Sequence, residues 1–449
     1  MAVNLEELPL PDELPVIPDG WRYESLGDLV EERGVSYGIV QPGSETADGV
    51  PIVRVNNIRN GRIDTTDMLK VGADIEAKFL RSRLRGGEVL LTLVGTLGEV
   101  AIVPDNLRGW NVARAVGVIP VRKDPGSLWV SICLRSAFIQ HCIRTWATTT
   151  VQATFNLRDL AKLPIPTPPT ATREAIAAVL GALDDKIELN RRMNATLEAM
   201  ARALFQSWFV DFDPVRAKLD GREPPGLDPA TAVLFPEHFD QAGDMPRPTG
   251  WQPKAVYDCA RFINGVAFRN VQFSSDGSGL PVVKIAELKN GISPQTKFTT
   301  AELVQRYKIR DGEILFSWSG SPDTSIDTFV WAGGDGWLNQ HIFKVEFHQP
   351  EEKLFVYYLL KHLKPTFIEI ARDKQTTGLG HVTAQDMKRL HVAFPTKPVL
   401  QAFQRAVQPL FERCFATLTE SRTLATLRDT LLPKLLSGQL RVTEALTAA

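Results

Sequence analysis

Two long stretches of the chain carry apolar residues at alternating intervals of four and three, the spacing of a coiled-coil seam. The positions in the first stretch are Ile176, Leu180, Leu183, Ile187, Asn190, Asn194, Leu197, Ala201, Leu204 and Trp208. The positions 227 residues later are Phe403, Val407, Leu410, Cys414, Thr417, Ser421, Leu424, Arg428, Leu431 and Leu435. This pattern predicts two long amphipathic helices of about 38 residues, each roughly 57 Å in length.

The middle of each seam is polar. Asn190 and Asn194 interrupt the first seam, and Thr417 and Ser421 interrupt the second. An antiparallel pair of helices would bring these residues level, and a buried polar layer fixes the register of such a pair at some cost in stability. We therefore predict an antiparallel pair, with the alternative that each helix packs only on its own domain.

A region of mixed character precedes each predicted helix. Short β-branched runs such as PIVRV, EVLLTLV and AVGVIPV are bounded by Gly, Asn and Pro, which is typical of strands. Helical stretches follow at SLWVSICLRSAFIQHCIRTWA and EKLFVYYLLKHLKPTFIEIAR. Prolines then end each region, at 164–169 in the first half and at 395–398 in the second.

The two halves repeat one another. Residues 49–63, GVPIVRVNNIRNGRI, match residues 279–293, GLPVVKIAELKNGIS, and Gly109-Trp110 matches Gly336-Trp337. From Trp110 onward we expect a single offset of 227 to fit without a gap. A repeat of this length indicates duplicated structural units.

The predicted fold is α+β, with two similar mixed α/β domains separated by a long antiparallel two-helix coiled-coil spacer and related by a pseudo-two-fold internal repeat. The expected segments are an N-terminal extension at 1–19, the first domain at 20–168, the first spacer helix at 169–212, a Pro-rich linker at 213–249, the second domain at 250–397, the second spacer helix at 398–441 and a tail at 442–449.

The composition of the chain argues against several classes of protein. The chain has 449 residues, 44% of them apolar and 23% charged, with a formal net charge of −1. No apolar run reaches the roughly 20 residues of a membrane span, and no signal peptide is recognisable at the start, so we expect a cytoplasmic protein without membrane association. The four cysteines form no CxxC pair, which argues against a zinc site or a disulfide framework.

Several catalytic signatures are missing from the sequence. There is no GxxxxGKS or GxxxxGKT phosphate loop, no GxGxxG after a strand, no HExxH, no GxSxG, and no NPPY-type or DPPY-type tetrapeptide. These observations favour a non-catalytic protein with two heads that bind two related but different things. We expect no cofactor and no metal in this chain.

Two helix-terminal segments resemble a known family. Residues 202–218, RALFQSWFVDFDPVRAK, and residues 428–442, RDTLLPKLLSGQLRV, are similar to the conserved regions of type I restriction–modification specificity (S) subunits. The Pro-Asp-Gly-Trp and Pro-Thr-Gly-Trp openings of the two domains, and the run LDGREPPGLDPATAVLFPEHF, are similar as well. The resemblance covers essentially the whole chain.

The resemblance implies a DNA sequence-specificity subunit. Each domain would be a target recognition domain reading one half of a bipartite, asymmetric double-stranded DNA target, and the helix pair would set the gap. The partners would be two methyltransferase (modification) subunits that use S-adenosylmethionine, and restriction subunits that need ATP and Mg²⁺. Two alternatives stay open: a two-headed structural adaptor that does not bind DNA, and the specificity module of a methylation-only system.

Three loop segments in each domain concentrate side chains that can match base edges. The candidates in the first domain are Arg54, Asn56, Asn57, Arg59, Arg62, Asn111, Arg114, Thr148, Thr149, Thr150 and Gln152. The candidates in the second domain are Lys284, Lys289, Asn290, Asn339, Gln340, His341, Gln375, Thr376 and Thr377. The alternative is a plain turn, with Gly61 at positive φ and asparagines capping the backbone.

Mismatches inside these matched loops are consistent with two domains that read different sequences. Asn56-Asn57 stands against Ala286-Glu287, and Val112-Ala113-Arg114 stands against Asn339-Gln340-His341. Apolar residues near the helix ends are candidates for docking the partner subunits, with local core packing as the alternative. These residues are Phe205, Trp208, Phe209, Phe212, Leu432, Leu435 and Leu436.

Overall fold

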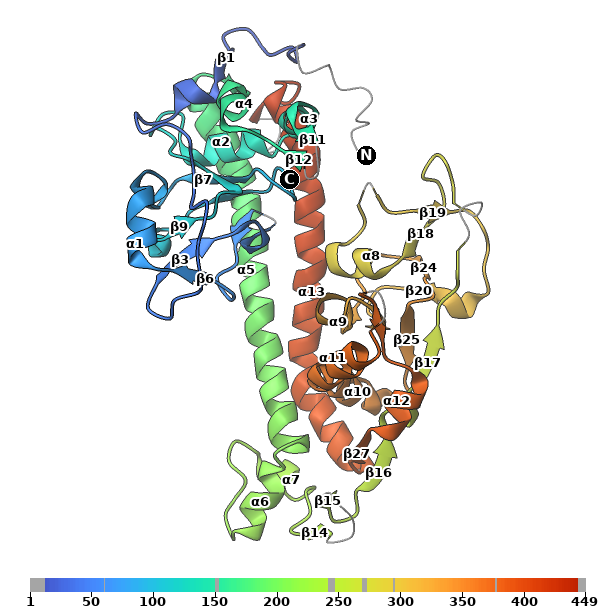
Figure 1. Cartoon of the computed structure of the whole chain (residues 1–449). Helices are drawn as coiled ribbons and strands as arrows, with labels where there is room; N and C mark the ends of the chain where they lie inside the picture. Colours follow the sequence, from blue (N-terminus) through green and yellow to red (C-terminus); the bar gives the residue numbers. More distant parts are fainter. Residues whose placement is uncertain are drawn as a thin grey trace. The chain divides into compact units, whose positions relative to one another are not determined.

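The computed structural model describes residues 13–59, 61–149, 153–240, 247–268, 273–293, 295–375 and 378–442 (Figure 1). The chain divides into two compact units, residues 1–187 with 423–449 and residues 188–422. Each unit is described by itself.

Unit 1 is built on two small sheets and a two-stranded ribbon. The four-stranded sheet has the order β2 (Ser36–Tyr37), β10 (Val116–Ile119), β7 (Val89–Thr92) and β8 (Val100–Ile102). The three-stranded sheet has the order β6 (Leu69–Val71), β3 (Val50–Val53) and β9 (Asn111–Val112), with β3 and β9 parallel. The ribbon joins β1 (Arg22–Ser25) to β13 (Pro164–Thr167).

Short hairpins and helices complete unit 1. The hairpins are β4 (Ile58–Arg59) with β5 (Arg62–Ile63) and β11 (Thr148–Thr149) with β12 (Ala153–Thr154). The helices are α1 (Ala73–Glu76), α2 (Ser127–Leu134), α3 (Ala137–Trp146) and α4 (Leu157–Lys162). Ser136 and Asn156 cap α3 and α4 by accepting backbone N–H groups, which explains where these helices begin.

Unit 2 repeats this topology. Its four-stranded sheet has the order β17 (Arg261–Asn264), β25 (Ile342–Glu346), β21 (Ile314–Ser317) and β23 (Asp327–Val330). Its second sheet has the order β19 (Phe298–Thr299), β18 (Leu280–Val283), β24 (Gly336–Leu338) and β20 (Lys308–Ile309), with β18 and β24 parallel. Its ribbon joins β16 (Gln252–Ala255) to β27 (His391–Phe394).

Further pairs and helices belong to unit 2. The pairs are β22 (Ser319–Gly320) with β26 (Gly380–His381) and β14 (Phe239–Asp240) with β15 (Arg247–Pro248). The helices are α6 (Asp213–Leu219), α7 (Pro229–Ala232), α8 (Ile285–Asn290), α9 (Pro322–Ser325), α10 (Lys353–His362), α11 (Lys364–Asp373) and α12 (Ala384–Arg389).

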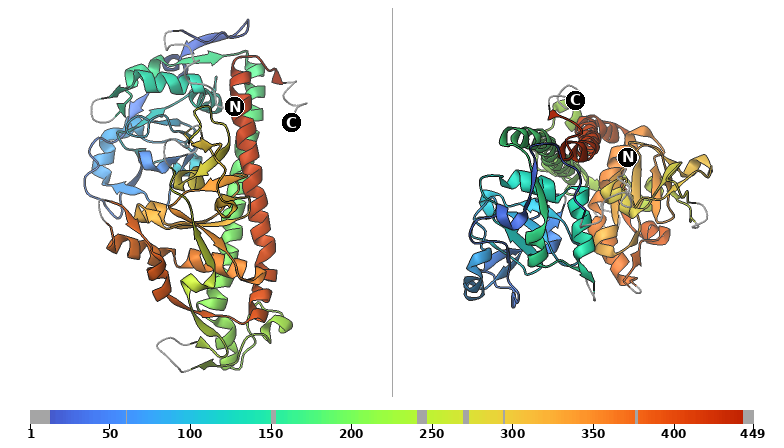
Figure 2. Two further views of the ribbon diagram at one scale, coloured as in Figure 1. Left: turned by 90° about the vertical axis from the view of Figure 1, so that its right-hand side faces the viewer. Right: turned by 90° about the horizontal axis from the view of Figure 1, so that it is seen from above.

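Two helices of 40 residues each, α5 (Thr170–Phe209) and α13 (Lys397–Leu436), contribute residues to both units. They run antiparallel, as the views of Figure 2 show. In unit 1, Ile176 and Leu180 share a core with Leu431 and Leu435. This pairing confirms the predicted antiparallel seam.

The predicted polar layer is also confirmed, within unit 2. Asn190 is fully buried, and its Nδ2 donates to Glu420 Oε2 at 2.8 Å and to Ser421 Oγ at 3.3 Å. Thr417 Oγ1 donates to Asn194 Oδ1. Such a layer penalises any other register, because shifting one helix would leave these groups buried without partners.

The alignment of the two halves between Trp110 and α10 differs from the expected one. Ile52 pairs with Asn111 in unit 1, and Val282 pairs with Trp337 in unit 2. Thr92 likewise pairs with Val116, and Ser317 with Ile342. The offset is therefore 226 across β9 and β10, and the gap-free alignment of Trp110 with Trp337 is wrong. Backbone hydrogen bonds set the register. The offset is still 226 between the starts of α2 and α10, Ser127 and Lys353, and becomes 227 between the starts of α3 and α11, Ala137 and Lys364.

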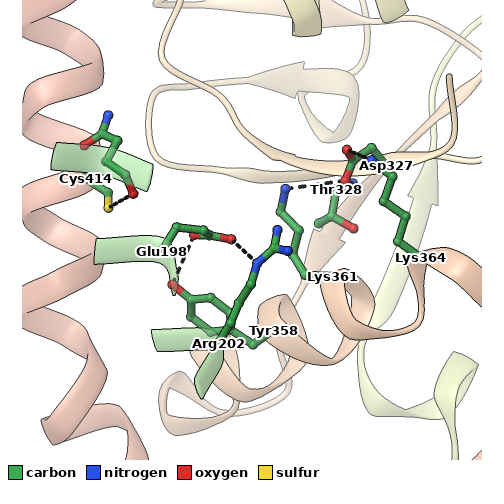
Figure 3. A network of polar contacts seen from close by, with 9 residues as sticks. Glu198, Arg202, Asp327, Thr328, Tyr358, Lys361, Lys364 and Cys414 are labelled. Atoms are coloured by element: carbon green, nitrogen blue, oxygen red, sulfur yellow. Dashed lines mark hydrogen bonds and ion pairs between the residues drawn. The ribbon is translucent and has the colours of Figure 1, made fainter. Parts of the chain in front are cut away.

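A half-buried charge cluster lies in unit 2 (Figure 3). Asp327 Oδ2 lies 2.6 Å from Lys364 Nζ, and its Oδ1 lies 3.4 Å from Lys361 Nζ and accepts the N–H of Thr328 at 2.7 Å. Burial by itself would raise the pKa of Asp327, but the two lysines and this N–H together lower it below its ordinary value. The cluster joins β23 to α10 and α11.

Asp327→Asn is expected to destabilise the chain at pH 7 by about 1–3 kcal/mol, because two lysines lose their carboxylate. A lowered folded-state pKa contributes stability that is present above the unfolded pKa of about 3.9 and is lost as the pH falls through the folded value. The difference in thermal midpoint between variant and wild type should therefore shrink below pH 4. Asp323→Asn, at an exposed pair with Arg372, is the control and should cost little at any pH.

Candidate nucleic-acid interface

The parallel strands bring two of the three predicted segments together in each unit. β3 and β9 end at the same edge, where the N–H of Ala113 donates to Val53 O at 2.9 Å. Arg54 is the first residue after β3, and Arg114 is the second residue after β9. In unit 2 the N–H of Asn339 donates to Val283 O at 3.1 Å, so Lys284 and Gln340 follow the corresponding strands.

The third segment lies next to the second. The N–H of Leu93 donates to Ala115 O, and the N–H of Phe155 donates to Leu93 O, both at 2.8 Å. Leu93 thus links the β9–β10 turn to the residue after the β11–β12 hairpin. In unit 2 Trp318 holds the same place, between His341 O at 3.4 Å and the N–H of Val382 at 2.8 Å.

The predicted DNA-contacting residues fall into four groups. The exposed ones are Asn56, Arg59, Arg114, Thr148, Lys289, Asn290, His341 and Gln375. The half-buried ones are Arg54, Arg62, Lys284 and Gln340. The buried ones are Asn57, Asn111 and Asn339. Thr150, Gln152, Thr376 and Thr377 lie outside the described residues, and for Thr149 only the backbone is described.

Asn57 serves the scaffold in this structure. Its side chain is 3% exposed, and its Oδ1 accepts the N–H of Arg54 at 2.9 Å. Its Nδ2 donates to Asp64 O at 3.1 Å and Asp67 O at 3.0 Å. Glu287 takes the same place in unit 2, where its Oε2 accepts the N–H of Lys284 at 3.0 Å. Asn57 and Glu287 therefore differ in residue type but make the same hydrogen bond to the backbone.

Asn111 is fully buried as well, with both ends of its amide occupied. Its Oδ1 accepts from Ser82 Oγ at 2.8 Å and from the N–H of Val112 at 2.9 Å. Its Nδ2 donates to Glu76 Oε1 at 2.9 Å and Phe79 O at 3.1 Å. The Arg83 hydrogen bond to Glu76 lowers the pKa of that carboxyl despite its burial. DNA contact by the exposed and half-buried residues stays a prediction.

The hairpin of the first segment follows the expected turn geometry. Gly61 has φ +80° in unit 1, and the matching Gly291 has φ +76° and ends α8 in unit 2. The same glycine therefore supports a hairpin in one unit and a helix end in the other, because glycine pays no steric penalty at positive φ.

The aromatic residues predicted to dock partners lie mostly in cores. Phe205, Trp208 and Phe209 are buried in the core of unit 2, where Phe209 packs edge-on against Phe403 with centroids 4.9 Å apart. Leu435 is fully buried in unit 1. For these four the structure favours local packing. Phe212, Leu432 and Leu436 are half-buried.

Trp318 and Asn264 were not among the predicted residues, yet both lie at the interface edge. Trp318 Nε1 donates to the exposed Asn264 Oδ1 at 3.1 Å, and its ring centroid lies 5.9 Å from that of His341. The repeat could have revealed Trp318, because it follows the strand EILFS as Leu93 follows EVLLT.

These features define a class of protein: two repeats of one α/β domain that present different polar side chains on matching loops, each joined to the same pair of long helices. The chain belongs to the type I restriction modification DNA specificity domain family, whose profile matches residues 18–199 and 248–419. Family membership confirms the predicted resemblance. Specificity subunits are the non-catalytic components that serve DNA sequence specificity, and this chain is one of them.

Several known proteins are similar to this chain. The MjaIX specificity subunit of Methanocaldococcus jannaschii is 28% identical over 95% of both chains. The HindI specificity subunit of Haemophilus influenzae is 26% identical over 64% of this chain and 71% of its own. The crystal structure of a type I restriction–modification S subunit from M. genitalium aligns over 94% of this chain and 99% of its own, with a TM-score of 0.49 and 16% identity. Among the described residues, no helix has the length and apolarity needed to cross a membrane.

Asn57→Ala is expected to lower the stability of the chain by about 1–3 kcal/mol, because three backbone groups lose their partner. The DNA sequence preference of the assembled complex should not change. Asn56→Ala, at the exposed neighbour, should leave the free energy of unfolding within about 0.5 kcal/mol of the wild-type value. A stable Asn57→Ala protein with an altered target sequence would contradict the scaffold role.

Proposed function

We propose that this chain directs a type I restriction–modification complex to a bipartite, asymmetric DNA target, with one half-site read by each recognition domain. The observation that carries the proposal is the repeated scaffold with exchanged side chains. Equivalent loop positions hold Arg114 in one domain and Gln340 in the other, on backbones with the same hydrogen bonds. Side chains of these types match base edges, and a change of side chain on a constant backbone changes the base preferred.

The helix pair is proposed to set the gap between the two half-sites. α5 and α13 each contain 40 residues and would extend about 60 Å at 1.5 Å per residue. Half-sites on one face of B-DNA lie about 34–36 Å apart. The buried Asn190 and Thr417 layer supports a spacer of fixed register rather than one that slides.

The partners are proposed to be two methyltransferase subunits and the restriction subunits. They would bring S-adenosylmethionine, ATP and Mg²⁺, and the methyltransferase subunits would also neutralise much of the DNA phosphate charge. The formal net charge of −1 is consistent with this division, because binding to DNA phosphates needs local basic patches or a basic partner. Phe212, Leu432 and Leu436, which the cores of the two units cover only partly, are the proposed docking residues.

The test is single-molecule sequencing of modified bases in cells that express the chain with its methyltransferase subunit, compared with cells that lack the chain. We expect methylated adenine in a motif of two parts separated by a fixed gap, present only with the chain. If the methyltransferase subunit is folded and bound but no chain-dependent motif exists, the DNA-specifying function is overturned in favour of an adaptor.

A further inference from the structure

Arg114 and Gln340 occupy the same position in the two recognition domains. The N–H of Arg114 donates to Ile39 O at 2.9 Å, and the N–H of Gln340 donates to Val266 O at 3.0 Å. The residues before them, Ala113 and Asn339, form the corresponding parallel bridges to those same two strand residues. Direct alignment of the sequences instead places Arg114 opposite His341, so this equivalence is visible only in the backbone hydrogen bonds.

In each domain, backbone hydrogen bonds hold the turn that contains this residue, both before and after it. After Arg114, Ala115 O accepts from Leu93 at 2.8 Å, and the turn closes with the N–H of Val116 on Ala113 O at 2.9 Å. In the second domain the turn closes with the N–H of Ile342 on Asn339 O at 3.2 Å. A turn held by strands on both sides positions its side chain without a large ordering cost on binding.

A glycine, Gly38 in the first domain and Gly265 in the second, packs closely against the backbone at this turn. A Cβ on Gly38 would lie 1.8 Å from Val112 O, and a Cβ on Gly265 would lie 2.5 Å from the equivalent Leu338 O and 2.2 Å from Asn339 O. No residue with a side chain fits at either position without moving the backbone. The two domains therefore keep the same close contact beneath a side chain that differs between them.

The side chains of Arg114 and Gln340 both reach solvent, where they could contact DNA. Arg114 is exposed, and within the described part of the chain its guanidinium has no hydrogen bond or ion pair to another side chain. Gln340 is half-buried, and its Nε2 lies 3.1 Å from His341 Nε2. The ring centroid of Trp318 lies 5.9 Å from that of His341.

We propose that Arg114 and Gln340 are the equivalent base-reading positions of the two domains, and that they select guanine and adenine respectively. The proposal rests on the function proposed above. Arginine makes paired hydrogen bonds to guanine O6 and N7, and glutamine makes paired hydrogen bonds to adenine N6 and N7. A phosphate contact at this position would orient the domain without selecting a base, so exchanging the side chain would then weaken methylation equally at all sequences.

The experiment exchanges the two residues in the full chain, co-expressed with its methyltransferase subunit, and reads the methylated motif by single-molecule sequencing. Arg114→Gln should change one G·C pair in one part of the motif, with methylation of the original sites reduced roughly tenfold or more. Gln340→Arg should change one A·T pair in the other part only. Arg114→Lys should keep guanine with weaker methylation, because lysine lacks the paired donors.

Two controls separate the possible results. Arg108→Gln and Gln305→Arg alter exposed side chains elsewhere in the same domains and should leave the motif unchanged. Thermal midpoints of the purified variants check folding. The inference is overturned if wild-type chain yields a bipartite motif and the folded variants yield the same motif, or lose methylation equally at all sequences. Absence of any motif with wild-type chain would instead overturn the proposed function.

Discussion

The parallel pairing of β3 with β9, and of β18 with β24, is the constraint on which the candidate interface depends. Parallel strands end at the same edge of a sheet, so the loops that follow them must stand side by side. This places Arg54 beside the Arg114 turn in one domain and Lys284 beside the Gln340 turn in the other. Backbone hydrogen bonds make the arrangement, and the exposed side chains are free to vary on it.

The same separation between scaffold and variable side chain explains the loop residues that proved to be structural. Asn57 and Glu287 differ in charge, yet each accepts the N–H of the first residue after a parallel strand. What the domains share is a buried acceptor at a fixed backbone position. A difference between the two halves therefore supports a candidate DNA contact only where the side chain also reaches solvent, as at Arg114.

The sequence predicted the features that depend on periodicity, and it missed those that depend on packing. The four-three spacing anticipated both long helices, and the polar midpoints anticipated the contact of Asn194 with Thr417, because seam positions follow directly from helical geometry. The register between Trp110 and α10 was wrong, since two similar Gly-Trp pairs outweighed a one-residue difference that only strand pairing reveals. Phe205 and Phe209 were ambiguous because a helix end can cover a linker or a partner. Trp318 was missed because it belongs to no recognised motif, although the repeat places it opposite Leu93, and its hydrogen bond to Asn264 is seen only in the structure.

The central claim is that each domain reads its own half-site on a common backbone. The most direct measurement replaces residues 250–396 with residues 20–169 in the full chain and sequences the adenine methylation it directs with its methyltransferase subunit. The account predicts a motif whose two parts contain the same bases, because both domains would then carry the Arg114 side-chain set. A motif that keeps both original parts would contradict the account, because recognition would then lie outside the exchanged domain.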